Sequence, residues 1–338
     1  MDLSFRDHIL DLNKPPLLIA EAGVSHFGSL DRAYKLINLA SQSGCKTIKF
    51  QHFSTSELIS EVDKEWRNRL KGRDTTKEFI TSILEYAKKS RIHCFFTPHT
   101  EEALNDLISI GSNDVIKVGS GERGNNQFIR KILDSGAFVL LSTGTYLDYD
   151  LLELRNLLED YPPNSACILH CNTTYPTPFN EVNLRTIEYL QTIFKGIASI
   201  GYSDHTEGIS IPLSSVVLGV RVIEKHISLE KNIPNAQDWK VSCFEEDLPI
   251  LVKSIDQVWA SSNKKISEKI ISRDENNNRE WANKSCYLIE DLHPNKKLTR
   301  DLYKSQRPYS GMSPDQVENK LLGKIYNGKK VLKKGYSF

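Results

Sequence analysis

Short apolar runs alternate with longer amphipathic segments from about residue 17 to about residue 258. The short runs have the length of buried strands, and the longer segments repeat their apolar residues at the period of a helix. Eight strands are predicted: Leu17–Glu21, Thr47–Gln51, His93–Thr97, Val115–Gly119, Phe138–Ser142, Cys167–His170, Ser199–Tyr202 and Val222–His226. Helices are predicted between them, including Asp31–Ser41, Lys77–Lys89, Glu101–Ile110, Asn126–Leu133, Leu151–Leu158, Asn183–Ile193 and a helix within Gly208–Gly219.

Eight repeats of strand then helix in roughly 240 residues match the arithmetic of an α/β fold of the (β/α)8 TIM-barrel type. A doubly wound open sheet is the competing architecture. The strand count weighs against the open sheet. So does the first strand, because no Gly-rich dinucleotide or phosphate loop follows it. The sequence therefore predicts a barrel.

The repeat pattern ends after Val258. The next twenty residues are rich in Ser, Lys, Asn and Glu and are expected to form an exposed linker, with a short helix near Lys265–Ile271. A second unit begins near Asn283 and contains a dense turn segment, Arg307–Pro314. We predict a barrel domain over residues 1–262, a linker over 263–282 and a small domain over 283–338. A unit of about 55 residues has a marginal core, so it is expected to pack against another surface.

Polar side chains cluster where the predicted strands end. In a TIM barrel these ends, with the loops that follow them, form the active site. A single buried polar residue is usually a satisfied structural one, but polar residues after all eight strands indicate a site. The residues concerned are Glu21, Lys49, Gln51, Thr97, His99, Lys117, Ser120, Glu122, Ser142, Thr143, His170, Thr173, Tyr175, Asp204, His205, Glu224 and His226.

Two of these residues, His205 and His226, end consecutive predicted strands and are expected to lie side by side. Neighbouring imidazoles suit a divalent metal that keeps open positions for water and substrate. Either histidine taken alone reads better as a hydrogen-bonded structural residue. As a pair at the strand ends they predict a metal site.

Lys49 and Lys117 end the second and fourth predicted strands, where a buried ammonium group needs an anionic partner. One interpretation is an internal salt bridge, with Glu21, Glu122 or Glu224 as candidate partners. The other interpretation is a bound anionic substrate.

Composition narrows the class of protein. The chain has 44 basic and 43 acidic residues among 338, a net charge of +1, which gives no indication of nucleic-acid or anionic-membrane binding. The six cysteines are scattered, and we expect them to be reduced. No signal-peptide pattern opens the chain and no 18-residue apolar run is present, so the expectation is a cytoplasmic enzyme without a membrane segment.

A set of short motifs occurs in order along the chain: Ile19–Val24, Ile48–Gln51, Phe96–Pro98, Ile116–Glu122, Leu141–Gly144, Leu169–Cys171, Tyr175–Pro178, Asn183–Arg185, Gly201–Thr206 and Val222–His226. This ordered set resembles the sialic acid synthase family. These enzymes condense phosphoenolpyruvate with an N-acetylated amino sugar and release phosphate, forming a nonulosonic acid. The C-terminal unit is similar to the antifreeze-protein-like (SAF) domain of the family, so the resemblance covers nearly the whole chain.

The resemblance implies roles for particular residues. His205 and His226 would hold Mn²⁺ or Mg²⁺, and imidazole ligands favour Mn²⁺ of the two. Arg307 of the small domain would reach into the site of a neighbouring subunit in a domain-swapped homodimer. The implied catalytic residues are Glu21, Glu122, His205, His226 and Asp238. The implied substrate-binding residues are Lys49, Gln51, Thr97, Lys117, Ser120, Ser142, Thr173, Tyr175 and Arg307.

The chain departs from the family pattern at positions that would face the sugar. Trp239 follows Asp238 where the family has a histidine, and it would offer a flat apolar face. His99 stands where an aspartate is common, Thr173 where some members have asparagine, and the first loop, Val24–Gly28, lacks the asparagines usual there. A changed acceptor is the simplest inference, and a deoxygenated diacetamido sugar would suit a more apolar pocket as an alternative to N-acetylmannosamine.

Two rival functions remain open at this stage. A phosphoenolpyruvate-condensing aldolase for phosphorylated sugars would need extra basic residues near the sugar, where only Arg123 and Arg185 stand out. A catalytically weakened, sugar-binding homologue would explain Trp239, but it would not need the set of histidines, lysines and carboxylates described above.

Overall fold

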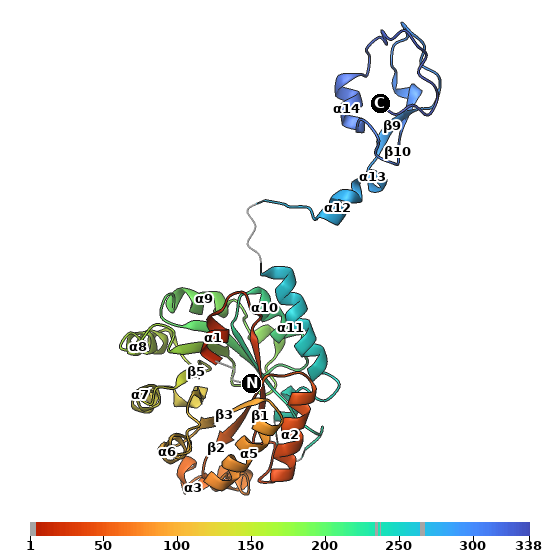
Figure 1. The fold of residues 1–338 in the computed structure, drawn as a ribbon. Helices are drawn as coiled ribbons and strands as arrows, with labels where there is room; N and C mark the ends of the chain where they lie inside the picture. The colour runs from red at the N-terminus through yellow and green to blue at the C-terminus, as the bar shows by residue number, and fades with distance from the viewer. Residues whose placement is uncertain (1–4, 234–235, 237, 264–267) are drawn as a thin grey trace. The chain divides into compact units, whose positions relative to one another are not determined.

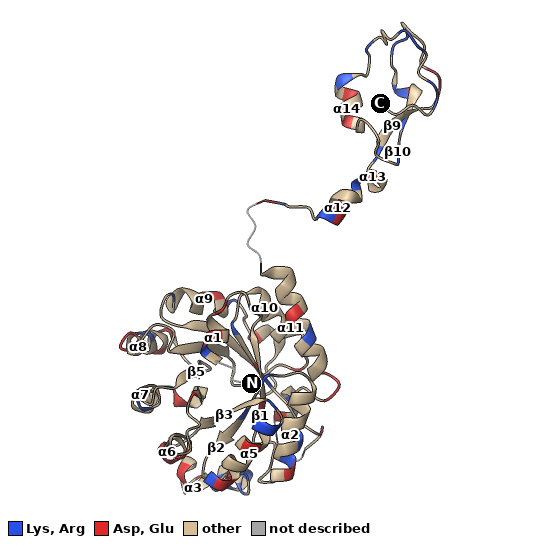
Figure 2. Ribbon diagram, viewed as in Figure 1, with Lys and Arg blue, Asp and Glu red and all other residues tan. Residues whose placement is uncertain are grey.

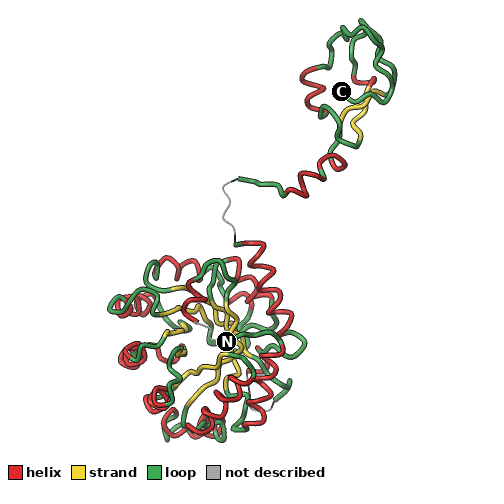
Figure 3. The backbone as a smooth tube through the Cα atoms, in the orientation of Figure 1, coloured by secondary structure: helices red, strands yellow, loops and turns green. Residues whose placement is uncertain are grey.

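A computed structural model describes residues 5–233, 236, 238–263 and 268–338. Eight parallel strands close into a barrel in the order β1 to β8, and helices surround the ring of strands (Figure 1, Figure 3). β8 pairs with β1 in register from Val222↔Leu17 to His226↔Glu21, which closes the ring. The predicted TIM barrel is confirmed. An open sheet would leave its two edge strands unpaired, so the pairing of β8 with β1 excludes it.

The eight strands are β1 Leu17–Gly23, β2 Thr47–His52, β3 His93–Pro98, β4 Val115–Val118, β5 Phe138–Ser142, β6 Ala166–Cys171, β7 Ser199–Asp204 and β8 Val222–His226. Each lies within one or two residues of its predicted bounds. The helices of the barrel unit are α1 Phe5–Leu10, α2 Leu30–Gln42, α3 Thr55–Leu58, α4 Lys64–Leu70, α5 Lys77–Lys89, α6 Glu101–Ser109, α7 Asn126–Asp134, α8 Asp148–Leu158, α9 Thr186–Ile193, α10 Ser210–Val217 and α11 Leu248–Ser262.

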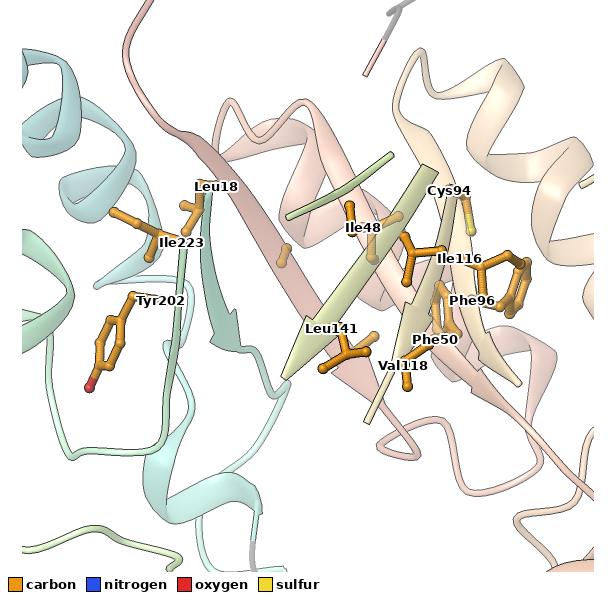
Figure 4. Packing of buried hydrophobic residues seen from close by; sticks show 14 of the residues in the cluster. Leu18, Ile48, Phe50, Cys94, Phe96, Ile116, Val118, Leu141, Tyr202 and Ile223 are labelled. Atoms are coloured by element: carbon orange, nitrogen blue, oxygen red, sulfur yellow. The ribbon is translucent and has the colours of Figure 1, made fainter. Parts of the chain in front are cut away.

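The strands are buried on both faces, and the two-residue period of a strand divides their side chains into two sets. The outer set packs against the surrounding helices. Figure 4 shows the labelled part of this layer, which is Leu18, Ile48, Phe50, Cys94, Phe96, Ile116, Val118, Leu141, Tyr202 and Ile223. The inner set fills the barrel, and its apolar members are Leu17, Ile19, Phe95, Val115, Phe138, Leu140, Cys167, Leu169 and Val222.

The N-terminal helix α1, which the sequence pattern did not predict, belongs to this inner layer. Phe5 and Ile9 of α1 are buried and cluster with the inner apolar residues of the strands. The Phe5 ring packs edge-on against Phe95 at a centroid separation of 5.4 Å. These contacts fill the N-terminal end of the barrel with apolar side chains, so the open, polar end lies at the strand C-termini.

The second unit comprises residues 265–338 and has its own small core. Its two antiparallel strands are β9 Ser285–Leu288 and β10 Tyr303–Gln306, and its helices are α12 Arg273–Asn277, α13 Arg279–Ala282 and α14 Pro314–Lys320. The small antiparallel sheet agrees with the predicted SAF domain. The exact linker bounds stay a prediction.

The helix predicted near Lys265–Ile271 lies partly outside the described residues, and residues 268–271 are not helical. The helix begins instead at Arg273, because the Ser272 hydroxyl accepts a hydrogen bond from the Glu275 backbone N–H and caps its first turn. Likewise α9 begins at Thr186 and not at the predicted Asn183, whose φ of 45° is not helical.

Both signs of charge occur over the helices of the barrel unit, as the near-zero net charge predicts (Figure 2). Within the described part of the chain, no helix combines the length and the apolarity needed to span a bilayer. All six cysteines are buried, and none of them forms a disulfide in the structure.

Candidate active site

A cavity of about 200 Å³ opens among the C-terminal ends of the barrel strands. Its wall continues the inner faces of the strands, where side chains two residues beyond the apolar filling become polar. Each strand contributes at least one such residue in or just after it: Glu21, Lys49, Thr97, Lys117, Ser142, Cys171, Ser203 and Glu224. A cavity therefore lies where the site was predicted, at the strand C-termini.

Gly201 shows how tightly the barrel is filled just below this cavity. A Cβ atom on Gly201 would lie 2.4 Å from the Leu169 Cδ2 atom and 2.9 Å from the Val222 carbonyl oxygen. Only glycine fits there without a shift of the packed neighbours. The floor of the cavity is therefore a close-packed apolar layer.

Lys49 is buried among polar groups of three neighbouring strands. Its Nζ atom lies 2.9 Å from Glu21 Oε2, 2.9 Å from Thr97 Oγ1 and 3.6 Å from Glu224 Oε2. Burial opposes the charge on Lys49, but Glu21 and Glu224 outweigh burial and raise its pKa. This lysine therefore keeps its positive charge inside the barrel.

Lys117 lies near the Glu224 carboxylate, as Lys49 does. Its Nζ atom donates to Ser142 Oγ at 2.8 Å and lies 3.9 Å from Glu224 Oε1. Burial lowers the pKa of Lys117, with Glu224 opposing the shift. For Glu224 itself burial favours the neutral acid, but Lys117 and Lys49 outweigh it and lower its pKa to about 2.

Glu224 was predicted as a polar strand-end residue and a candidate partner of the lysines, but not as a catalytic or substrate-binding residue. In the structure it lies between the two lysines. Its Oε1 atom also accepts a hydrogen bond from Ser203 Oγ at 2.9 Å. The signal was present in the sequence, because Glu224 precedes His226 by two residues and shares its strand face. The internal-salt-bridge interpretation of the lysines was thus right for Glu21 and Glu224, while no ion pair joins Glu122 to either lysine among the described residues.

His205 and His226 lie side by side at the cavity, as predicted, with ring centroids 5.3 Å apart. His205 Nδ1 contacts the Asn172 carbonyl oxygen, which directs Nε2 toward the Tyr175 hydroxyl at 2.8 Å. His226 is buried, and burial lowers its pKa to about 4, so its imidazole is neutral near pH 7.

The imidazole pair fits a divalent metal. His226 Nδ1 is buried and has no hydrogen-bond partner in the described structure, as expected of an atom that awaits a ligand. The nitrogen that His205 could offer is Nε2, which lies 2.8 Å from the Tyr175 hydroxyl. In the described ranges no three His, Cys, Asp or Glu side chains group closely enough to hold a metal by themselves. Two imidazoles would therefore need water or substrate oxygens to complete the coordination.

A second cavity of about 290 Å³ adjoins the first, because Gln51, Tyr175 and His226 line both. Asp238 of the 3-10 helix η3 (Asp238–Val241) lines this second cavity. Gln51 Nε2 donates to Glu21 Oε1 at 3.2 Å, so the pair lies at the junction.

Most predicted site residues are brought together. The first cavity is lined by Glu21, Lys49, Gln51, Thr97, Lys117, Ser120, Ser142, Thr173, Tyr175, His205 and His226. It is also lined by His99 and Glu224, which were predicted as polar strand-end residues without a catalytic or substrate-binding role, and by Cys171 and Ser203, which were not predicted.

Two further predicted residues, Glu122 and Arg307, each make contacts within their own unit. Glu122 follows Gly121 of the lining but does not line the cavity, and its carboxylate accepts from Asn125 Nδ2 at 2.8 Å. Burial raises its pKa. Arg307 belongs to the second unit, where its guanidinium lies 5.8 Å from the Trp281 ring centroid.

The basic residues that line the second cavity are not the two that the sequence singled out. Arg123 is paired with Asp150 at 2.7 Å and Arg185 with Glu188 at 2.8 Å, and neither lines the two cavities. Arg69 and Arg73 line the second cavity instead. They lie in the long connection between β2 and α5, a segment to which the sequence pattern assigned no element.

Buried ammonium groups and a pair of imidazoles at the C-terminal mouth of a TIM barrel define an enzyme-like site for an anionic substrate. A model of the NeuB family matches residues 36–267, and the chain belongs to this family.

Several characterised proteins are similar to the chain over most of its length. The N,N'-diacetyllegionaminic acid synthase of Campylobacter jejuni is 35% identical over 327 residues, covering 92% of this chain and 96% of that protein. The pseudaminic acid synthase of the same organism is 29% identical, with 92% of each chain covered. The crystal structure of a sialic acid synthetase from Leptospira borgpetersenii, in complex with citrate, superposes with a TM-score of 0.72 at 31% identity, covering 78% of this chain and 90% of that one.

Proposed function

We propose that this protein condenses phosphoenolpyruvate with an N-acetylated amino sugar to form a nonulosonic acid and release phosphate. The observation that carries the proposal is the pair of buried ammonium groups, Lys49 and Lys117, in one cavity with His205 and His226. Relatives over most of the chain are synthases of legionaminic and pseudaminic acids, which are nonulosonic acids.

In the proposed reaction C3 of phosphoenolpyruvate forms a bond to the aldehyde carbon of the open-chain sugar, and the aldehyde oxygen gains a proton. Water adds to C2, and the C2–O bond to phosphate breaks. The products are one nonulosonate and one phosphate. The protein must hold two anionic groups, orient an aldehyde and move protons.

Lys49 and Lys117 bind the carboxylate and phosphate of phosphoenolpyruvate in this proposal. The substrate's anionic groups accept the hydrogen bonds that Lys49 and Lys117 otherwise donate to the Thr97 and Ser142 hydroxyl oxygens, at 2.9 Å and 2.8 Å. Glu224 holds the two ammonium groups together when the substrate is absent. Charge-assisted hydrogen bonds of this kind are among the strong ones in proteins.

His205 and His226 would hold a divalent cation, Mn²⁺ or Mg²⁺, with water and substrate as further ligands. Such an ion, when bound, polarises a carbonyl and lowers the pKa of water. Tyr175 contacts His205 at one end of the site and orients the sugar. Glu21, whose pKa burial raises, is the carboxylate best positioned to accept a proton at the junction of the two cavities, with Gln51 hydrogen-bonded to it.

Glu122 is assigned a lesser role than the sequence implied, because it does not line the cavity. Asp238 would accept a hydrogen bond from a sugar hydroxyl or amide in the second cavity. We further propose that the chain works as a homodimer in which Arg307 of the small domain touches the sugar bound by the partner subunit.

The proposal is tested by mass spectrometry of the products formed from phosphoenolpyruvate and Mn²⁺ with a panel of sugars. The panel contains N-acetylmannosamine, its 6-phosphate and a 2,4-diacetamido-trideoxyhexose. A nonulosonate mass, with phosphate released in equal amount, supports the proposal. Phosphate without a sugar product would indicate a hydrolase, and no reaction at all would favour the sugar-binding alternative. A reaction without sugar and one with a chelator are the controls.

A further inference from the structure

The wall of the second cavity comes in part from a segment that the proposed chemistry does not use. Trp66, Arg69 and Leu70 of α4 and Arg73 just beyond it line this cavity together with Val24. The cavity begins at Gln51, Tyr175 and His226 of the first site and ends at this wall. A sugar with its aldehyde at the imidazoles would therefore extend toward α4.

Helix α4 is not explained by packing of the core, because none of its seven residues is buried. Hydrogen bonds nevertheless fix the position of α4. Asp63 caps it by accepting from the Trp66 backbone N–H at 3.0 Å, and Arg67 Nε donates to the Ile59 carbonyl at 2.9 Å. Trp66 keeps 49% of its surface exposed on this helix. The Arg69 guanidinium lies over its ring at 5.3 Å from the centroid. A large aromatic side chain that stays half exposed beside a cavity is typical of a ligand contact.

Arg73 is fixed by the loop that follows β1. Its guanidinium lies 4.8 Å from the Phe27 ring centroid, in cation–π contact. The two loops approach so closely that a Cβ atom on Gly28 would lie 2.3 Å from the Gly72 carbonyl oxygen. Gly28 has a φ of +74°, a conformation that also favours glycine. The position of Arg73 is therefore set by backbone packing.

The charges around the wall are balanced. Arg69 pairs with Glu65 at 3.0 Å and Arg32, behind Phe27, pairs with Glu230 at 3.0 Å. Asp238, which lines the same cavity, attracts Arg73 and partly offsets burial, which lowers the pKa of Arg73. A wall with compensated guanidinium groups and apolar faces favours an uncharged ligand with amide groups over a phosphate.

We infer that Trp66 and Arg73 determine acceptor specificity by binding the end of the sugar remote from its aldehyde. This inference rests on the proposed function. The group bound there is an uncharged acetamido substituent. Its methyl packs on Trp66 and Leu70, its carbonyl oxygen accepts from Arg73, and its N–H donates to Asp238. The preferred acceptor class is a diacetamido sugar, ahead of N-acetylmannosamine and its 6-phosphate.

The test compares kcat/KM for these three acceptors in the wild type, Trp66→Ala and Arg73→Gln. Each variant should lower kcat/KM for the diacetamido sugar by about tenfold or more and that for N-acetylmannosamine by less than about threefold, with the KM for phosphoenolpyruvate unchanged. Equal losses on both acceptors, a changed KM for phosphoenolpyruvate, or a wild-type preference for the 6-phosphate would overturn the inference.

Trp239→Ala is the matched control, because Trp239 adjoins Asp238 but does not line the cavity. If Trp239→Ala shifts the acceptor preference and Trp66→Ala does not, the inference is wrong. Trp66→Phe keeps an aromatic face and should retain much of the preference, which separates recognition from a folding defect. Thermal melting by circular dichroism establishes that each variant is folded.

A binding measurement keeps the inference testable if the wild type forms no product and the proposed function fails. The phosphoenolpyruvate-loaded protein is titrated with the diacetamido sugar, and tryptophan fluorescence is recorded. The sugar should change the fluorescence of the wild type, and the change should disappear in Trp66→Phe but persist in Trp239→Phe. No fluorescence change in the wild type, or the same change in Trp66→Phe, overturns the inference.

Discussion

Lys225 Nζ lies 2.6 Å from Asp204 Oδ2, and both side chains are fully buried. Asp204 and Lys225 are paired in register on β7 and β8, and each directly precedes a histidine of the imidazole pair. They point to the outer face of the barrel, while His205 and His226 face the cavity. Lys225 also donates to the Thr206 carbonyl oxygen at 2.6 Å. The buried pair thus ties together the two strand ends that position the histidines.

Removing Lys225 should destabilise the protein strongly. Lys225→Met leaves the Asp204 carboxylate buried without its cation, which typically costs about 3–5 kcal/mol. Urea unfolding followed by circular dichroism measures the change in the free energy of unfolding. Asp204→Asn combined with Lys225→Met removes both charges and should recover part of that loss. If Lys225→Met alone were as stable as the wild type, the ion pair would contribute little to stability.

His226→Ala should abolish turnover and leave the fold largely intact. Loss of a metal ligand forfeits several kcal/mol of transition-state stabilisation, so kcat should fall by about a hundredfold or more. Calorimetric titration with Mn²⁺ should show weaker binding in the same variant. His293→Ala, at an exposed position in the small unit, is the control and should leave both unchanged. Full activity in His226→Ala would contradict the metal assignment.

The affinity for phosphoenolpyruvate should fall at alkaline pH because of Lys117. Burial lowers its pKa below the ordinary 10.5, and only the protonated form attracts the anionic substrate. The protonated fraction is high below the lowered pKa and is lost as pH rises through it. The alkaline limb of kcat/KM for phosphoenolpyruvate should therefore begin below pH 10.5. In Lys117→Arg the side chain stays positively charged, so the alkaline limb should move to higher pH. If the limb does not move, another group causes it.

Arg307→Ala should raise the KM for the acceptor sugar by about tenfold and change that for phosphoenolpyruvate much less. The reason is that Arg307 is proposed to touch the sugar and not the anion site. Steady-state kinetics with each substrate varied in turn measures both values. Lys304→Ala, an exposed cation on the same unit, is the control. An unchanged sugar KM would remove the small unit from the active site.

The sequence was sufficient for the barrel and for the chemistry of its mouth. Apolar runs of strand length identified the eight strands, since each must be buried on both faces. The two-residue period then determined that Glu21, Lys49, Lys117 and His226 face inward, because side chains of a strand alternate between its faces. The NeuB family match agrees with the motifs at these strand ends.

Tertiary structure decided which polar groups meet. Glu224 was visible as a strand-end residue, but only the closed ring of strands brings its two oxygens between Lys49 and Lys117, which lie on β2 and β4. Glu122 follows the fourth strand closely enough to be predicted as a site residue. It lies in a short 3-10 turn, however, and does not line the cavity. The separation of two residues along the sequence does not predict whether their side chains contact each other across a barrel.

The second cavity likewise shows what the sequence predicted and what only the tertiary structure decided. The sequence pointed to Trp239 as the flat apolar face, whereas the structure lines the cavity with Trp66 from α4. Helix α4 has no buried apolar stripe, so it leaves no periodic signal in the sequence. By itself, then, the sequence determined what the strands are and which way their side chains point, because burial and period are local properties. The neighbours of each polar group were decided only by the fold, because they depend on contacts between distant segments.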